Sequence, residues 1–227
     1  MERKRILLIG GSPEPSSIST VIAASASCDK VVAVDRGLDI AMSAGLRPDL
    51  FCGDADSVSP VAAGVVSAAE LDDSSLSFEV ERYDPFKDSS DLSLAFKAIY
   101  ERWGETDVVC TCLSGGRPDH ALAVIGCLSR ADQTNVSLVE DGFEARILRV
   151  GDSWIIDDAL SRRFSVLALT EHSIASESGM HWNLDRQAIP LLSDWGISNY
   201  VDAPNASVTC HEGCLVAFLF QQRSALV

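Results

Sequence analysis

The sequence predicts an α/β protein with an N-terminal, mostly parallel α/β domain and a C-terminal antiparallel β-sandwich domain. Over the first two thirds of the chain, short β-branched runs alternate with helical patterns, as in parallel sheets covered by helices on both faces. Beyond about residue 142, short alternating runs are separated by Gly, Asp or Ser turns. With 227 residues, of which 47% are hydrophobic, the chain can bury the cores of two small domains. We expect these domains at residues 1–142 and 143–227.

Five strands and five helices are expected in the first part. The β-branched runs predict strands at 5–9, 31–35, 50–53, 78–82 and 107–113. Helical composition or apolar periodicity predicts helices at 17–26, 38–44, 61–69, 92–103 and 118–130. Active sites of such sheets lie beyond the carboxyl ends of the strands, so the residues that follow these strands are the first candidates for function.

The second part has a different pattern. Short runs predict strands at 143–156, 164–170, 173–177, 207–211 and 214–221, with no long helix among them. The stretch 181–201, which contains Trp182 and Trp195, is expected to be a long ordered loop. Loops of this length inside a compact domain are usually functional or misassigned.

Charge and hydropathy exclude several classes of protein. The chain has 33 acidic and 18 basic residues and a formal net charge of −15, whereas binding to duplex nucleic acid needs clustered Lys and Arg. Only four apolar residues, 6–9, precede two glycines near the start, fewer than the ~7 of a signal peptide. The longest later apolar run, 214–220, is far shorter than the ~20 residues that span a bilayer. We expect a cytoplasmic protein with no nucleic-acid or membrane partner.

The seven cysteines are expected to be reduced thiols. Cys110 and Cys112 lie two apart on a predicted strand, which is ordinary for buried thiols and poor spacing for a zinc site.

Carboxylates follow the third predicted strand in the run GDADS, residues 53–57. If the backbone stays extended there, Asp54 and Asp56 point to the same side. Such a pair suits Mg²⁺, which commonly takes one or two carboxylates, several waters and substrate phosphate oxygens. The alternative is that both residues form turn hydrogen bonds or cap the following helix.

A second acidic group occurs in KDSSD, residues 87–91, just before the predicted helix at 92–103. Asp88 and Asp91 have the spacing of a capping box with Asp in place of Glu. They can also complete a metal shell at the end of a neighbouring strand, with Lys87 neutralising a phosphate.

The run GGRPDH, residues 115–120, follows the fifth predicted strand. Gly115 and Gly116 let the backbone approach a ligand, Arg117 can bind phosphate through two hydrogen bonds, and the helix that starts here offers free N–H groups to an anion. Asp119 suits a metal or a substrate hydroxyl, and His120 can transfer protons. A structural role for His120 at the helix start is at least equally consistent with the sequence.

Asp35 ends the second predicted strand, where a carboxylate can accept a hydrogen bond from a ribose or substrate hydroxyl, or simply start a turn. The spacings GxGxxG and GxxxxGK[ST] are both absent. Neither a Rossmann dehydrogenase nor a P-loop kinase is therefore supported.

Two runs stand out in the second part: GMHWNL, residues 179–184, and GISN, residues 196–199. Trp182 can stack on an aromatic heterocycle, while Ser198 and Asn199 can form hydrogen bonds to it. The alternative, favoured when Trp182 is considered alone, is that this side chain fills the core of the sandwich.

Taken in order, these runs resemble the thiamine pyrophosphokinase family over nearly the whole chain. The resemblance rests on DRGLD, LRPDLFCGDADS, KDSSD, GGRPDH, GMHWNL and GISN. It implies an N-terminal α/β catalytic domain and a C-terminal β-sandwich, usually in a homodimer with active sites at the subunit interface. It also implies a Mg²⁺-dependent transfer of diphosphate from ATP to the hydroxyl of thiamine, which gives thiamine diphosphate and AMP.

The resemblance also implies roles for individual residues. The metal and catalytic set is Asp54, Asp56, Asp91, Asp119 and Arg117, of which the first three would bind Mg²⁺. The ATP and phosphate set is Asp35, Lys87, Asp88, Gly115, Gly116, Arg117 and His120. The thiamine set is Trp182, Ser198 and Asn199. Asp119 would lie near the reacting hydroxyl, and its action as a general base is a hypothesis.

The chain departs from the family pattern at several positions. The family usually has DGGAN where this chain has DRGLD, so Arg36 replaces a glycine and Asp39 replaces an amide. Ala55 replaces an aromatic residue, and Gly196 stands where a second serine is usual. Two other functions stay open: diphosphate transfer to another small alcohol such as a pterin, and a non-catalytic regulator that binds a nucleotide or thiamine.

Overall fold

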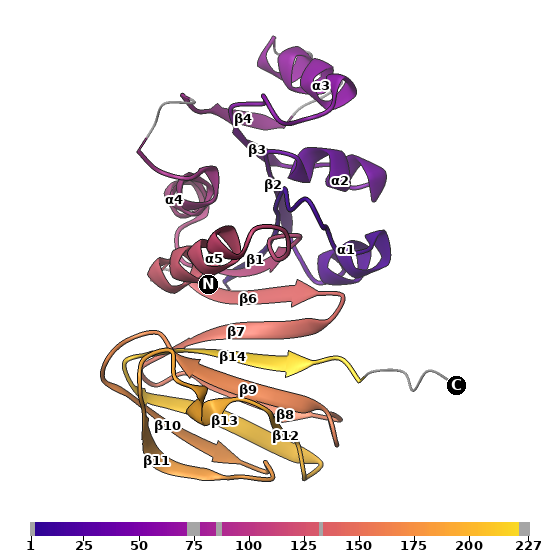
Figure 1. The fold of residues 1–227 in the computed structure, drawn as a ribbon. Coiled ribbons are helices and arrows are strands. Elements are labelled where there is room, and N and C mark those ends of the chain that lie inside the picture. The colour runs from indigo at the N-terminus through magenta and orange to yellow at the C-terminus, as the bar shows by residue number, and fades with distance from the viewer. Residues whose placement is uncertain (1–2, 72–77, 85–87, 132–133, 223–227) are drawn as a thin grey trace. The chain divides into compact units, whose positions relative to one another are not determined.

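The computed structural model describes residues 3–71, 78–84, 88–131 and 134–222. The chain divides into two compact units, Met1–Glu140 and Asp141–Val227 (Figure 1). The first is an α/β unit with a parallel sheet and the second consists of antiparallel strands, which confirms the predicted fold class.

The N-terminal unit is built on a parallel sheet. Its described strands are β1 (Lys4–Ile9), β2 (Lys30–Val34), β3 (Leu50–Gly53), β4 (Glu79–Arg82), β5 (Thr106–Thr111) and β6 (Thr134–Glu140). They pair in the order β6-β5-β1-β2-β3-β4, and every neighbouring pair is parallel. The inner strands β1 and β3 are apolar runs buried on both faces, which is the pattern of a covered parallel sheet.

Helices cover both faces of this sheet. They are α1 (Ile18–Ser25), α2 (Gly37–Ser43), α3 (Pro60–Glu70), α4 (Asp91–Trp103) and α5 (Pro118–Arg130), and their ends lie within one residue of those predicted. The first three lie on one face and the last two on the other (Figure 1). Apolar clusters join α1, α2 and α3 to the strands beneath them.

The order of the strands determines where a ligand can bind. The chain adds strands outward from β1 to β4 and then returns to place β5 on the other side of β1. The connections therefore reverse direction between β1 and β5. In open α/β sheets, the loops at the carboxyl ends of such a strand pair diverge and leave a crevice for a ligand.

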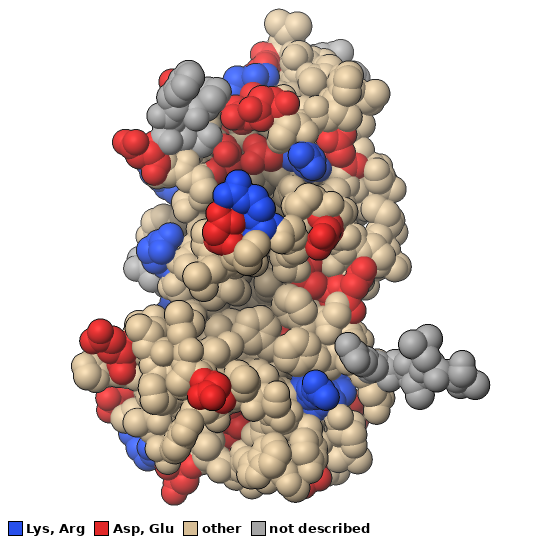
Figure 2. Space-filling view, viewed as in Figure 1, with Lys and Arg blue, Asp and Glu red and all other residues tan. Residues whose placement is uncertain are grey.

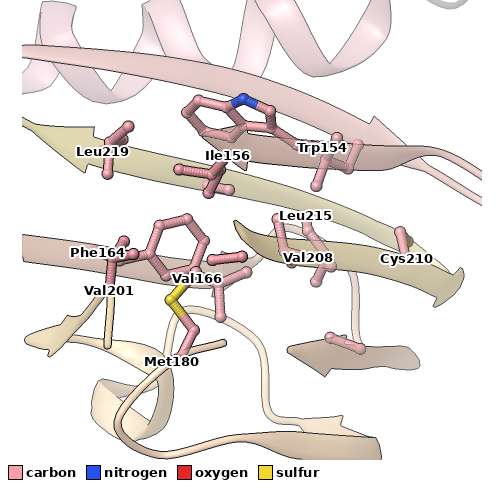
Figure 3. Close-up of a cluster of buried hydrophobic side chains, with 14 of the residues drawn as sticks. Trp154, Ile156, Phe164, Val166, Met180, Val201, Val208, Cys210, Leu215 and Leu219 are labelled. Atoms are coloured by element: carbon pink, nitrogen blue, oxygen red, sulfur yellow. The ribbon is translucent and has the colours of Figure 1, made fainter. Parts of the chain in front are cut away.

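The C-terminal unit is an antiparallel β-sandwich. Its described strands are β7 (Phe143–Arg149), β8 (Ser153–Asp157), β9 (Arg163–Ala168), β10 (Ser173–Ser178), β11 (Leu184–Ile189), β12 (Asn199–Tyr200), β13 (Asn205–Glu212) and β14 (Cys214–Phe220). One layer has the order β12-β9-β14-β7 and the other β11-β10-β13-β8. Side chains from both layers meet in the core, where the rings of Trp154 and Phe164 lie 6.3 Å apart (Figure 3).

Three expectations about strands were wrong. No strand was expected between 130 and 143, yet β6 is present there. The expected strand at 143–156 is two strands, separated by a turn at Gly151, whose φ is +91°. The expected loop at 181–201 contains β11, a short 3-10 helix (Asp194–Gly196) and β12. Because β11 is an edge strand and mostly exposed, it lacks the alternating pattern by which strands are recognised.

Surface charge and hydropathy complete the description. Figure 2 shows acidic and basic side chains interspersed on the visible face, so the acidic excess is not gathered there in one field. Within the described ranges, no helix combines the length and the apolar character that crossing a membrane requires. All seven cysteines are free thiols. Burial raises the pKa of several of them, for example Cys52 and Cys110, so these thiols are protonated.

Candidate active site

A cavity of about 560 Å³ lies in the N-terminal unit at the reversal between β1 and β5. Its walls come from the loops that follow β1, β2, β3 and β5, from the first turn of α4 and from one side of α5. Five residues of the predicted metal and phosphate sets line it: Asp35, Asp91, Gly115, Arg117 and His120. The structure therefore brings together residues from three separate sequence runs.

The loops after β1 and β5 are tied to each other. The amide of Gly10 donates to the Thr111 carbonyl at 2.9 Å, and the amide of Ser12 donates to the Cys112 carbonyl at 3.0 Å. A Cβ atom on Gly10 would lie 2.8 Å from the backbone carbonyl oxygen of Cys112. Only glycine permits this approach, so the first glycine after β1 has a packing role.

Glu140 fixes the loop after β5 and was missed by the sequence analysis. This side chain is 4% exposed at the end of β6. Its carboxylate accepts hydrogen bonds from the amides of Cys112 at 3.1 Å, Leu113 at 2.9 Å and Ser114 at 3.0 Å, and from Oγ of Ser16. Successive amides arranged in this way form an anion-binding concavity, which the protein fills with its own carboxylate.

A signal for Glu140 is present in the sequence once β6 is recognised. Val136, Leu138 and Glu140 are spaced two apart, and all three are buried. An acidic residue in the buried register of a strand needs hydrogen-bond partners, and so indicates a polar network.

Beyond this fixed loop the chain turns through two glycines into α5. The φ angles of Gly115 and Gly116 are +98° and +70°, both in the region that favours glycine. The amide of Gly116 donates to Oε2 of Glu14 at 3.2 Å. α5 then starts at Pro118, and its N-cap residue Arg117 forms no side-chain capping bond. The helix start therefore has the geometry expected of an anion site.

Arg117 and Asp119 form an exposed ion pair at this helix start. Nε of Arg117 lies 3.1 Å from Oδ1 of Asp119, and Nη2 lies 2.5 Å from Oδ2. The hydrogen bonds from Arg117 are the main reason that the pKa of Asp119 is lowered to about 2. Asp119 is thus a carboxylate at neutral pH and a weak proton acceptor, which favours an orienting role over general-base catalysis.

The loop after β3 differs from the expected extended backbone. Ala55 has a φ of +63°, so Asp54 and Asp56 do not alternate as residues of a strand, and that expectation was wrong. Oδ1 of Asp54 accepts a hydrogen bond from the Asp56 amide at 3.1 Å. The turn hydrogen bond that the alternative interpretation expected is therefore present.

At the end of β2, Asp35 packs against the loop after β3. The φ of Asp35 is +49°, and its amide donates to the Cys52 carbonyl at 3.0 Å. A Cβ atom on Gly53 would lie 2.1 Å from Oδ1 of Asp35. Glycine at position 53 therefore makes room for the Asp35 carboxylate at the cavity wall.

The capping box expected before α4 is not formed. The N-cap is Ser90, whose Oγ accepts from the Ser93 amide at 3.3 Å, and Asp91 is the first residue of the helix. Asp88 is exposed. Lys87 lies outside the described residues.

Several carboxylates at or near the cavity are candidate ligands of Mg²⁺. Asp91 lines the cavity, and Asp54 and Asp56 lie on the loop after β3. Among the described residues, no three His, Cys, Asp or Glu side chains are grouped closely enough to hold a metal ion by themselves. Mg²⁺ needs only one or two carboxylates when water and substrate phosphates supply the other oxygens. The donor chemistry therefore fits an ion held jointly with a phosphorylated substrate.

In the C-terminal unit, Trp182 does not fill the core. Its side chain is 59% exposed, whereas Trp154 is 2% exposed and occupies the core. The alternative that assigned Trp182 to the core was wrong. The third residue of the thiamine set, Ser198, is exposed with a φ of +63°, and its amide donates to Oγ of Ser165 at 3.1 Å.

Asn199 is buried beneath Trp182 and contacts Glu177, another residue that the sequence analysis missed. Asn199 is 6% exposed, and Glu177 is 3% exposed. Nδ2 of Asn199 donates to Oε2 of Glu177 at 2.9 Å. Burial raises the pKa of Glu177 from its usual 4.5 to about 7, although the hydrogen bond from Asn199 lowers it.

This raised pKa predicts a dependence of stability on pH. Below about pH 4.5 the carboxyl is protonated in both states, and as pH rises to about 7 the unfolded chain loses the proton first. The free energy of unfolding therefore falls through this range, by on the order of 3 kcal/mol. We expect Glu177→Gln to remove this contribution. Urea unfolding of both proteins should give similar stabilities near pH 4.5 and a more stable variant above pH 7; an equal difference at all pH values would contradict this.

Comparisons with known proteins agree on one family. The sequence model described as thiamin pyrophosphokinase, catalytic domain, matches residues 23–139. The thiamine pyrophosphokinase of Bacillus subtilis matches with a TM-score of 0.78 and 20% identity, over 96% of this chain and 100% of that chain. The enzyme of Geobacillus thermodenitrificans matches with 0.78 and 22%, over 98% and 100%. The enzyme of Candida albicans matches with 0.74 and 15%, over 97% and 90%. At these identities the structures establish a shared fold, and no curated protein sequence matches the chain.

Proposed function

The chain belongs to the thiamin pyrophosphokinase family, whose sequence model spans more than half of it, and on that premise we propose that it transfers diphosphate from ATP to the hydroxyl of thiamine. The products would be thiamine diphosphate and AMP. The observation that carries the proposal is the cavity at the reversal between β1 and β5, which is lined by Asp35, Asp91, Gly115 and Arg117. These residues suit the triphosphate of a nucleotide, because they combine close backbone approach, a cation and metal-binding oxygens.

In the proposed reaction, the thiamine hydroxyl oxygen attacks the β-phosphorus of ATP. A bond forms between them, the bond from that phosphorus to the oxygen bridging it to the α-phosphorus breaks, and AMP leaves with the bridging oxygen. The hydroxyl proton is released. Such transfers depend mainly on positioning and on neutralising charge.

The chain supplies three elements for this step. Arg117, at the N-cap of α5, would bind phosphate oxygens. Asp119, already a carboxylate, would accept a hydrogen bond from the hydroxyl and orient it. Asp54, Asp56 and Asp91 would hold Mg²⁺, which when bound offsets the charge of the diphosphoryl group.

Product analysis tests the proposal directly. Purified protein would be incubated with thiamine, ATP and Mg²⁺, and the thiamine phosphates, AMP and ADP would be resolved. Thiamine diphosphate and AMP in equal amounts support the proposal. Thiamine monophosphate with ADP would contradict it, as would AMP formation only with another alcohol such as a pterin. Nucleotide binding without any transfer would instead indicate a regulator.

Arg36 is a further cation for the nucleotide. It lines the cavity at the N-cap of α2, and among the described residues its guanidinium has no ion-pair partner. An exposed arginine in a cavity beside carboxylates suits an anionic substrate. We infer that it binds a phosphate of ATP.

Replacing Arg36 with glycine is expected to raise the KM for ATP about tenfold, because one charge-assisted hydrogen bond is lost. The KM for thiamine should not change. Arg47→Gly is the matched control. Arg47 is exposed and precedes β3, so it lies at the amino ends of the parallel strands, away from the cavity at their carboxyl ends. Equal effects of both substitutions would show that only the net charge matters, and would contradict a contact by Arg36.

We also propose that the protein is a cytoplasmic homodimer. The C-terminal unit exposes several large apolar side chains, among them Ile155 at 68%, Trp195 at 63% and Leu192 at 53%, which a second copy could cover. Seven free thiols are typical of a reducing compartment. Sedimentation at several protein concentrations tests the dimer, and a monomer at all of them would contradict it.

A further inference from the structure

Trp182 has an exposed side chain on a firmly held backbone. It lies between β10 and β11, in the short connection from Gly179 to Asn183. The Trp182 amide donates to Oδ1 of Asn199 at 3.1 Å, and the Trp182 carbonyl accepts from Nδ2 of Asn199 at 2.8 Å. One side-chain amide thus binds both backbone polar groups of Trp182, as a neighbouring strand would.

The hydrogen-bonding capacity of Asn199 is filled by the protein itself. An amide side chain has two N–H donors and two acceptor positions on its oxygen. Besides the two bonds to Trp182, Oδ1 accepts from the Tyr200 amide at 3.0 Å, and Nδ2 donates to Oε2 of Glu177 at 2.9 Å. Asn199 therefore has no hydrogen bond left to offer a ligand.

Glu177 adds to the contacts that fix which way this amide faces. Its carboxyl lies on β10, and its Oε2 is an acceptor opposite Nδ2 of Asn199. In the flipped amide, Oδ1 would face an acceptor, and the Trp182 carbonyl would face Oδ1 as well. The other oxygen, Oε1, accepts no hydrogen bond from the described residues, so the contact with Asn199 is the role that this buried carboxyl has in the structure.

Neighbouring aromatic rings add to the support of Trp182. The His181 ring stacks on Tyr200 at a centroid distance of 4.5 Å and an interplanar angle of 19°. It meets Trp182 edge-on at 4.6 Å and 84°. The His181 amide also donates to the Tyr200 carbonyl at 3.0 Å. Trp182 is therefore held through its backbone and contacted by the His181 ring, while more than half of its side-chain surface is open.

We propose that Asn199 and Glu177 are positioning residues: Asn199 holds the backbone of Trp182, Glu177 holds the amide of Asn199, and both act on thiamine only through the indole of Trp182. This inference rests on the proposed function, in which the indole stacks on an aromatic ring of thiamine. It assigns a role to Glu177, which no sequence motif indicated. It also replaces the ligand contact implied for Asn199 with a supporting role.

Steady-state kinetics with thiamine as the varied substrate test the proposal. Glu177→Leu removes one of the four hydrogen bonds that hold the amide of Asn199, so this amide is less firmly fixed, and the KM for thiamine is expected to rise about tenfold through lost preorganisation. Neither kcat nor the KM for ATP should change. Glu177→Gln retains an acceptor oxygen and should stay within about twofold of the original protein. Asp185→Ala is the matched control, because it removes a carboxylate from the exposed part of β11 and leaves the network intact.

A double substitution decides whether the effect passes through Trp182. In a Trp182→Ala background, Glu177→Leu should add less than about a twofold change in the KM for thiamine. An undiminished tenfold effect would mean that Glu177 contacts thiamine itself, and would overturn the proposal. So would a tenfold effect of Glu177→Gln, because the charge and not the acceptor would then matter.

A readout without substrate separates this inference from the proposed function. With 5-fluorotryptophan incorporated, the fluorine signal of Trp182 is assigned from its loss in Trp182→Phe. We expect one narrow line in the original protein and in Glu177→Gln, and a shifted or broadened line in Glu177→Leu. An unchanged line in Glu177→Leu would overturn the positioning role.

If thiamine is not a substrate but the fluorine line of Trp182 still changes in Glu177→Leu, the proposed function fails and the positioning of Trp182 stands. Glu177→Asp, whose carboxyl is one methylene too short to reach Asn199, replaces Glu177→Leu if that variant does not fold.

Discussion

Arg117→Ala is expected to lower kcat for diphosphate transfer by on the order of 10³-fold, the effect of removing an arginine that stabilises a transferring phosphoryl group. Arg117 lines the cavity and holds Asp119 through two hydrogen bonds, so its loss also frees the carboxylate meant to orient thiamine. Without these bonds, the pKa of Asp119 should rise from about 2 towards its ordinary value. The measurements are kcat and its pH dependence, whose acid limb should move to higher pH.

Two further variants show whether the effect depends on the charge of Arg117, on its guanidinium group or on any arginine of the helix. Arg117→Lys keeps the charge but lacks the planar guanidinium group that can form two hydrogen bonds to one phosphate, so it should recover only part of kcat. Arg130→Ala is the control, because Arg130 is an exposed arginine in the last turn of the same helix, far along it from the phosphate end. If Arg117→Ala retains kcat and alters only the KM for ATP, Arg117 binds the ground state alone and its proposed catalytic role is wrong.

Glu140→Ala is expected to have the largest effect on stability, about 3–5 kcal/mol of the free energy of unfolding. The substitution leaves the buried Cys112 amide, the partly buried amides of Leu113 and Ser114 and the Ser16 hydroxyl without their acceptor. The stability of Glu140→Gln should lie between those of the original protein and Glu140→Ala. Its carbonyl oxygen can still accept from the amides of Leu113 and Ser114, whereas its NH₂ group faces the Cys112 amide. Urea unfolding measures both, and Glu144→Ala on β7 is the control for losing a less buried acid.

Activity at low temperature separates the stability of Glu140 variants from their effect on the site. Under conditions where Glu140→Gln is fully folded, kcat should still be reduced, because the loop that carries Gly115 and Arg117 is no longer anchored. Full activity of the folded variant would show that the carboxylate stabilises the sheet without positioning the phosphate loop.

The sequence predicted the helices of the N-terminal unit well, because the signals for each helix lie within its own residues. The periodicity of Leu92, Ala95, Phe96 and Ile99 and the proline at position 118 are signals within one helix, and they gave the ends of α4 and α5 to within one residue. The alternation of strands and helices predicted a parallel sheet. Asp35, Asp91 and Arg117, which follow its strands along the chain, were therefore expected at the carboxyl ends of the strands, where they line one cavity.

What the sequence did not predict depends on contacts between distant residues or on single backbone angles. The role of Glu140 follows from three amides that lie more than twenty residues away along the chain. Ala55 adopts a positive φ although nothing in GDADS requires it, so the arrangement of Asp54 and Asp56 could not be deduced. The partner of the buried Glu177 is Asn199, which is 22 residues away along the chain on a two-residue strand.

The reversal between β1 and β5 has a consequence for folding. The hydroxyl of Ser12 binds the carbonyl of Ser114, so a contact in the cavity wall closes a loop of 102 residues. Closing a loop of this size costs chain entropy before any contact is gained, and contacts this distant in sequence are made slowly. The cavity is therefore completed only when β5 docks beside β1. A nascent chain that has formed β1 to β4 alone holds Asp35 and Arg36 but lacks the opposite wall, so the proposed nucleotide site cannot form before β5 and β6 are in place.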